Sequence, residues 1–250
     1  MSGHSKWATI KRKKAANDAR RSNQYAKLLR AVEVAAREGG SGDVTANMTL
    51  ASAVEKAKAF SVPTDNIDRA IKRGTGEDSS AARYEEITYE GYAPGGIALF
   101  VEALTDNRNR TAQEVRHAFT RNGGNLGETG STAWMFSRKG VVVVEKRVAP
   151  DEERLLELAL EGGAEDLRDS ESSWDIISDP TAFNDVRAAL DTAGVAIDSA
   201  EISMVPQSSI PVDGTEAKHV LNMIEALEDL DDVQNVYANF DIPEEVMASL

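Results

Sequence analysis

Side chains that could bind phosphate gather at the start of the sequence. The first forty residues contain ten lysines and arginines, against the three acids Asp18, Glu33 and Glu38. A cluster of cations can bind the phosphates of a nucleic acid, or it can be a solvated helix face. We favour phosphate binding because the cluster belongs to a chain whose net charge is -14. The ten are Lys6, Lys11, Arg12, Lys13, Lys14, Arg20, Arg21, Lys27, Arg30 and Arg37.

Two other side chains of this N-terminal arm have more than one possible role. Trp7 could stack on a base or pack against neighbouring helices. His4 has no second metal ligand nearby in the sequence, so we expect it to be a polar neighbour in the arm.

A second group of cations lies in the string TDNRNRTAQEVRHAF, which begins at Thr105. Arg108 and Arg110 stand between an apolar strand and the start of a helix, and Arg116 lies on that helix. Backbone N–H groups at a helix start favour anions, so these residues could bind a ligand. Equally, Asp106 could pair with an arginine and an asparagine could close a turn, which would make the string an internal network.

Catalytic chemistry finds little support in the sequence. His4, His117 and His219 are isolated, and cysteine is absent. The acids of the C-terminal half are spread as helix-surface residues. We read the pair Asp231 and Asp232 as part of an exposed turn after an acidic helix. The sequence therefore predicts a protein that is not an enzyme, with no cofactor and no metal.

Charge is distributed unevenly along the chain. The net charge is +8 over residues 1–76, -2 over 77–140 and -20 over 141–250. This separation predicts a cationic N-terminal module that meets phosphates and an acidic half that repels them or binds a protein partner. The absence of cysteine fits a reducing compartment, and no stretch has the length of a membrane span, so we expect a cytoplasmic protein without membrane contact.

The N-terminal part has the pattern of a small helical bundle. Apolar residues at helical spacing predict a helix over residues 10–37 and a second one ending near Phe60. A third helix is expected to have Thr64 as its N-cap and to end at Gly74. The Gly/Ser-rich stretch that follows predicts a domain border near Gly76.

The middle of the chain mixes strands and helices. Strands are predicted over residues 85–91 and 97–104, followed by a helix from Thr111 to Arg121 that starts with a capping box, Thr111 to Glu114. The string STAWMFSRKGVVVVEK suggests two strands around a turn at Lys139 and Gly140.

The order of elements after residue 140 is strand, helix, strand, strand, helix, strand, which is that of a ferredoxin-like module. The last helix and strand are too few to fold alone, so we expect them to return to the sheet begun at residues 84–104. The predicted fold class is α+β with three domains: a basic helical domain, 1–76; a discontinuous α/β domain, 77–140 plus 206–250; and an acidic ferredoxin-like domain inserted into it, 141–205.

Several strings of the sequence resemble the YebC family, which includes the mitochondrial translational activators of cytochrome c oxidase subunit one. They are MSGHSKWATIKRKKAANDARR, VPTDNIDRAIKRG, YEGYAPGG, LTDNRNRTAQEVRHAFTRNGGNLG, FSRKGVVV, LEGGAEDL and LEDLDDVQNVYANF. The resemblance covers nearly the whole length and implies one helical and two α/β domains. By position it places the nucleic-acid-facing arm at Gly3, His4, Ser5, Lys6 and Trp7 and at Lys11 to Lys14, and a second basic surface at Arg108, Arg110 and Arg116.

The resemblance implies a regulator of gene expression, because the family comprises DNA-binding transcriptional regulators and translation factors that act on the ribosome, including relief of stalling. We expect ribosomal or transfer RNA as the partner, since shape and phosphate recognition suits structured RNA. Promoter DNA is the alternative, and an enzyme using a central cleft is a third reading that lacks a suitable constellation of residues.

Overall fold

The computed structural model describes residues 18–76 and 84–243, and for residues 18–21 it describes the backbone alone. The described residues form two compact units. One contains residues 18–76, 84–131 and 218–236, and the other contains residues 132–217 and 237–243.

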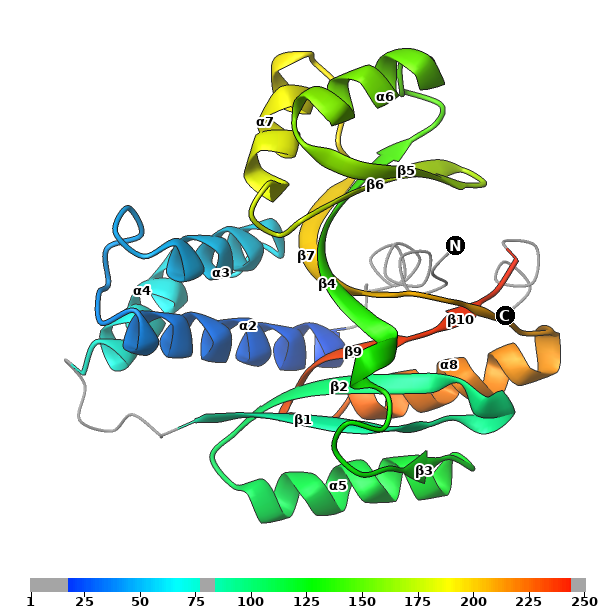
Figure 1. The fold of residues 1–250 in the computed structure, drawn as a ribbon. Coiled ribbons are helices and arrows are strands. Elements are labelled where there is room, and N and C mark those ends of the chain that lie inside the picture. The colour runs from blue at the N-terminus through cyan, green and yellow to red at the C-terminus, as the bar shows by residue number, and fades with distance from the viewer. Residues whose placement is uncertain (1–17, 77–83, 244–250) are drawn as a thin grey trace. The chain divides into compact units, whose positions relative to one another are not determined.

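Three helices form a bundle in the first unit (Figure 1). They are α2 (Asp18–Glu38), α3 (Met48–Ala59) and α4 (Thr64–Gly74). Small and branched apolar residues at helical spacing on α2, among them Leu28, Val32 and Ala36, are buried against Leu50 of α3 and Ile67 of α4. The predicted helices are confirmed within the described residues, and residues 10–17 of the first one lie outside them.

The helix starts of the bundle differ in how they are capped. Asn47 caps α3, because its Oδ1 accepts from the N–H of Leu50 at 3.0 Å. Its Nδ2 donates to the carbonyl of Ala35 on α2 at 2.8 Å, so this side chain also joins two helices. The prediction that Thr64 caps α4 is wrong, since Pro63 occupies the cap position and Thr64 is the first helical residue. Proline suits this place because it has no N–H to satisfy.

The first unit also contains a four-stranded sheet with the order β3-β1-β2-β9. The strands β1 (Glu85–Tyr92) and β2 (Ala98–Thr105) pair antiparallel, with Glu85 opposite Thr105, and are joined by the short helix η1 (Pro94–Gly96). The outer strands are β3 (Asn125–Leu126) and β9 (Val233–Ala238). The predicted return of the last strand to this sheet is confirmed, because β9 lies beside β2.

Helix α5 (Arg108–Arg121) packs on this sheet through Val115, Ala118 and Phe119. It begins three residues before the predicted start, with Asn107 as N-cap. The predicted capping box at Thr111 is therefore wrong, because Thr111 lies within the helix and is buried. The helix α8 (Gly214–Glu228) precedes β9 and buries Val220, Ile224 and Leu227.

The second unit contains the expected ferredoxin-like order. After the short helix η2 (Ala133–Met135) come β4 (Phe136–Glu145), α6 (Glu152–Glu161), β5 (Ala164–Ser170), β6 (Ser173–Ser178), α7 (Phe183–Thr192) and β7 (Ser199–Pro206). The antiparallel sheet has the order β5-β6-β4-β7. Both helices cover one face of it (Figure 1), where Val142, Val144 and Ile176 meet Leu155 and Val186. Two further short strands, β8 (Ile210–Pro211) and β10 (Phe240–Asp241), pair in parallel.

The predicted turn at Lys139 and Gly140 is wrong. Both residues lie within β4, which is one continuous strand paired with β6 on one side and β7 on the other. Gly140 is there for packing, because a Cβ at this position would lie 2.5 Å from Ser178 Oγ and 2.8 Å from Phe183 Cδ2.

These elements confirm the mixed fold class with a helical bundle and antiparallel sheets. The three domain ranges predicted from the sequence stay predictions.

Replacing Gly140 by alanine is expected to lower the free energy of unfolding by about 1–3 kcal/mol, because the added methyl group overpacks the contact with α7. Arg138→Ala, two residues away on the same strand and exposed, is the control and should cost less than about 0.5 kcal/mol. Urea denaturation of both variants measures the difference, and equal stability would contradict the packing role of Gly140.

Candidate nucleic-acid interface

Most of the predicted arm lies outside the described residues. This holds for Gly3, His4, Ser5, Lys6, Trp7 and Lys11 to Lys14, and the side chains of Arg20 and Arg21 are likewise not described. The described candidates are Lys27 and Arg30 on α2, and Arg108, Arg110 and Arg116 on α5.

Lys27 and Arg30 lie on one stripe of α2 together with Asn23, at spacings of four and three residues. This stripe faces the end of α8, where the last carbonyl groups of a helix have no partner within it. Asn23 Nδ2 donates to the carbonyl of Asp229 at 3.1 Å, and Lys27 Nζ donates to that of Glu228. Cations are favourable at this negative end of a helix dipole. Lys27 therefore makes an internal contact in the structure. The predicted contacts of Lys27 and Arg30 with nucleic acid stay predictions.

Arg30 belongs to a group of five side chains around a buried carboxylate, which we call the Asp232 cluster: Asp232, Arg30, Arg110, Thr105 and Thr111. Asp232 is 1% exposed. Its Oδ1 accepts from Arg30 Nη1 at 2.9 Å, and its Oδ2 accepts from Arg110 Nη2 at 2.6 Å. The hydroxyl oxygens of Thr111 and Thr105 lie 2.7 and 3.0 Å from the same Oδ2.

The cluster ties four elements of the first unit together. Thr105 ends β2, Arg110 and Thr111 lie in the first turn of α5, Arg30 comes from α2, and Asp232 directly precedes β9. Arg30 Nη1 also reaches the carbonyls of Leu104 and Asp231, each at 3.0 Å. One arginine on the helical bundle thus contacts both β2 and the turn that leads into β9.

The DNRNR string forms an internal network, which is one of the two roles that the sequence left open. Asn107 caps α5 by accepting from the N–H of Arg110 at 3.2 Å, and its own N–H donates to Thr105 Oγ1 at 2.8 Å. Arg110 Nη2 also pairs with Asp106 at 2.9 Å. Arg110 is therefore held by two carboxylates, and its predicted contact with nucleic acid is not tested by this geometry.

Arg108 and Arg116 differ from Arg110 because they project from the network. The side chain of Arg108 is 70% exposed, and its nearest carboxylate, that of Glu85, lies 3.6 Å away. Arg116 is also exposed. Arg110 is also partly exposed, at 44% of its side chain, but it is paired with two carboxylates.

The surroundings of Asp232 also set its proton affinity. Burial raises the pKa of a carboxyl group, but the hydrogen bonds from Arg110, Thr111 and Thr105 outweigh it, so the pKa of Asp232 lies below the ordinary value. The bonds to Asp232 and Asp106 raise the pKa of Arg110 in turn. Asp232 is therefore an anion at neutral pH, which balances part of the charge of two arginines.

Asp232 is not expected from the sequence as a site residue, because the sequence places it in a turn after an acidic helix. Its partners are remote in sequence, 202 residues away for Arg30 and 122 for Arg110, so no local pattern marks it. The available signal was that the strings around Arg110 and Asp232 both take part in the family resemblance. Within the described ranges, no group of three or more side chains could hold a metal ion, and no helix is long and apolar enough to cross a membrane.

Replacing Asp232 by asparagine is expected to cost about 2–4 kcal/mol of stability at neutral pH, because it removes the anion that two arginines share. This cost is smaller than that of breaking a fully buried ion pair, because the Arg110 side chain is 44% exposed. Chemical denaturation of Asp232→Asn measures the loss, with the exposed neighbour Asp231→Asn as control. The role assigned to Asp232 would be refuted if both variants were equally stable.

The stability gap between wild type and Asp232→Asn is expected to depend on pH. Because the pKa of Asp232 is lower in the folded state, its contribution is full above the unfolded value near ~4 and is lost as the pH falls through the folded value. Denaturation curves recorded from pH 7 to pH 3 should show the gap closing at the acidic end. A gap that stays constant over this range would contradict the argument.

Two family models together span most of the chain. One, described as the TACO1/YebC protein N-terminal domain, matches residues 5–77, and the other, described as the TACO1/YebC second and third domain, matches residues 84–240. The first match ends at residue 77, and the second begins at residue 84.

Full-length relatives are similar throughout. A protein of Syntrophus aciditrophicus is 53% identical and one of Rubrobacter xylanophilus 56% identical, each over 250 residues that cover 100% of this chain and 99% of the relative. Both carry the name "Probable transcriptional regulatory protein". The crystal structure of a conserved hypothetical protein from Aquifex aeolicus is 45% identical, with a TM-score of 0.79 over 92% of this chain and 94% of that one. On this evidence the chain belongs to the TACO1/YebC family.

Proposed function

We propose that this protein is a nucleic-acid-binding regulator of gene expression that acts in the cytoplasm on ribosome-associated RNA. The observation that carries the proposal is the separation of charge, +8 over residues 1–76 and -20 over residues 141–250. A cationic module on so acidic a chain is the electrostatic footprint of a surface that meets phosphates. The proposal includes no catalytic step, in keeping with relatives that are named as regulatory proteins.

The proposed contact surface combines the arm residues, 3–7 and 11–14, with exposed cations of α5. Arg108 and Arg116 support it, because their side chains are exposed. Lys27 and Arg30 bind the last carbonyl of α8 and Asp232 instead, and Arg110, although 44% exposed, is paired with Asp232. The arm therefore has to supply most of the phosphate contacts.

The exposed acids in the first half of α4 argue against a helix-turn-helix reader of duplex DNA. Helix α4 follows α3 after four residues, a link length that helix-turn-helix proteins also have. A recognition helix of that class places its N-terminal residues against base edges in the major groove. The first half of α4 instead exposes Asp65 and Asp68, which would meet phosphates and acceptor groups unfavourably.

The second candidate function is a transcriptional regulator that binds promoter DNA. The name shared by the relatives from Syntrophus and Rubrobacter favours it. Both candidates use the same basic arm, so the nature of the nucleic acid has to be determined by experiment.

Neutralising the arm is expected to weaken nucleic-acid binding and its salt dependence. In full-length protein carrying Lys11→Gln, Arg12→Gln, Lys13→Gln and Lys14→Gln, the slope of log K against log salt should fall in magnitude by about three, at roughly 0.7–0.9 per lost phosphate contact. The matched control carries Arg138→Gln, Arg147→Gln, Arg154→Gln and Lys218→Gln, four exposed cations that lie outside the basic module of residues 1–76. Fluorescence anisotropy with an RNA hairpin and with duplex DNA measures both slopes.

Equal losses in the two variants would contradict the role of the arm. Sedimentation of lysate through a sucrose gradient, with and without ribonuclease, then separates the two candidates. Salt-sensitive co-migration with ribosomes supports the RNA proposal, whereas migration apart from ribosomes together with capture by promoter DNA supports the transcriptional one.

A further inference from the structure

Two arginines of the helical bundle share one buried carboxylate away from the Asp232 cluster. Glu33 of α2 is 4% exposed. Its Oε1 accepts from Arg37 Nη2, one helical turn further on, at 3.0 Å, and its Oε2 accepts from Arg73 Nε of α4 at 2.8 Å. The side chains of Arg37 and Arg73 remain 30% and 33% exposed.

The close approach of the two helices depends on Gly74. A Cβ at this position would lie 2.3 Å from the carbonyl oxygen of Glu33 and 2.7 Å from the Cβ of Ala36, so no larger residue fits without moving the helices apart. The glycine therefore lets the last turn of α4 lie directly on the turn of α2 that carries Glu33 and Arg37. This contact is what brings the guanidinium groups of Arg37 and Arg73 to the same carboxylate.

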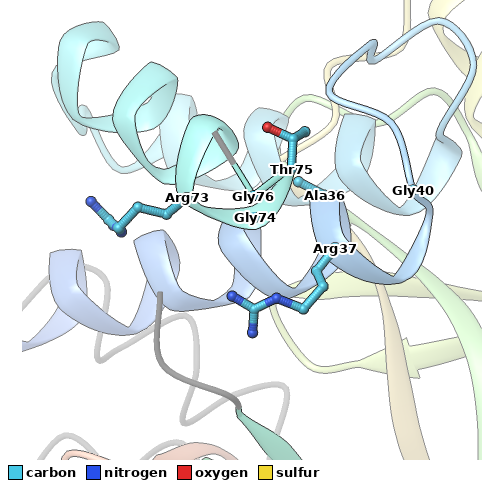
Figure 2. A pocket seen from close by; sticks show the side chains of 7 residues that line it. All are labelled: Ala36, Arg37, Gly40, Arg73, Gly74, Thr75 and Gly76. Carbon is cyan, nitrogen blue, oxygen red and sulfur yellow. The ribbon is translucent and has the colours of Figure 1, made fainter. Parts of the chain in front are cut away.

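A pocket of about 400 Å³ opens between the ends of these two helices (Figure 2). Arg37, Arg73, Ala36 and Gly40 line it together with the residues 74–76 at the end of α4. Its volume falls within the ~300–1,000 Å³ range of small-ligand sites. Figure 2 shows the side chain of Arg37 extending from α2 and that of Arg73 extending from α4.

The charge of this group favours an anion. Two guanidinium groups and one carboxylate leave a net charge of +1. Each guanidinium has five N–H groups in a rigid fork that matches phosphate geometry. The hydrogen bond from Arg73 to Glu33 uses Nε of this fork. Because Glu33 already holds the guanidinium groups in place, a ligand would find them ordered and would lose less entropy on binding.

From this geometry we infer that Arg37 and Arg73 form a phosphate-binding site, and that the phosphate belongs to the backbone of the nucleic acid in the proposed function. The inference rests on that proposed function for the source of the phosphate, and it adds a contact at the C-terminal ends of α2 and α4. Arg37 is one of the ten N-terminal cations for which the sequence favours phosphate binding, whereas Arg73 is not among the residues singled out from the sequence.

The test replaces both arginines together with Glu33, so that no buried carboxylate is left without a partner. A variant with Glu33→Gln, Arg37→Gln and Arg73→Gln changes the net charge by -1 and leaves no unpaired buried charge. Its matched control, with Glu55→Gln, Lys56→Gln and Lys58→Gln on exposed positions of α3, changes the net charge equally. A second variant, Arg37→Lys with Arg73→Lys, keeps the charge and the pairing with Glu33 but removes the planar fork. Thermal melting verifies that each variant folds.

Binding of an RNA hairpin by full-length protein is the first measurement. The Gln triple variant should bind about tenfold more weakly than wild type, as expected when hydrogen bonds to a charged group are lost, and the double lysine variant should be weakened less. The α3 control should change the affinity by less than about threefold, as expected for exposed charges. Equal losses in the triple variant and the control would overturn the site while leaving the proposed function intact.

A second measurement applies if wild-type protein does not bind RNA, an outcome that would refute the proposed function itself. Thermal melting is then repeated with inorganic phosphate. A melting temperature that rises for wild type but not for the Gln triple variant would keep the pocket as a site for free phosphate. No rise in either protein would overturn the site as well.

Discussion

The first unit depends on one buried carboxylate. Asp232 accepts from two arginines and two threonine hydroxyls that come from a helix of the bundle, the end of a strand and the start of another helix. A charge without water is costly unless it is paired and hydrogen-bonded, so each partner has to be in place at once. This requirement fixes where α5 begins, because Asn107 and Thr111 are held through Thr105 and Asp232. It also places β9 beside β2, since the backbone of Asp232 accepts from Leu104 at 2.8 Å.

Seven cations of the described part differ in their roles. Lys27 and Arg30 join the bundle to the end of α8 and to the sheet, and Arg110 joins α5 to Asp232. Arg108 and Arg116 are exposed, and Arg37 and Arg73 are ordered by Glu33 while remaining partly accessible. A count of positive residues therefore overstates how many are available to a polyanion. The chain uses part of its scarce positive charge to assemble itself.

Much of the architecture could be predicted from the sequence. Apolar periodicity gave α2, α3 and both central strands of the first sheet, and the element order gave the ferredoxin-like unit. The failures came where a distant contact outweighs a local pattern. Thr111 and Glu114 have the form of a capping box, but Asn107 caps the helix and Thr111 bonds to Asp232 instead. Gly140 follows a lysine, as in a turn, but it lies within β4, where a side chain would collide with Phe183. Asp232 resembled a surface acid because its partners lie more than a hundred residues away.

The position of β9 near the C-terminal end of the chain has a consequence for biosynthesis. A ribosome releases the helices of the bundle first, and the acidic ferredoxin-like segment follows before Asp232 and β9 are made. Contacts that span 202 residues are slow to form and cannot form before both ends exist. Until then Arg30 and Arg110 have no buried anion to pair with, and the β2 edge has no neighbouring strand. The unfinished chain is therefore more cationic at its surface than the finished protein, while it is still attached to a ribosome.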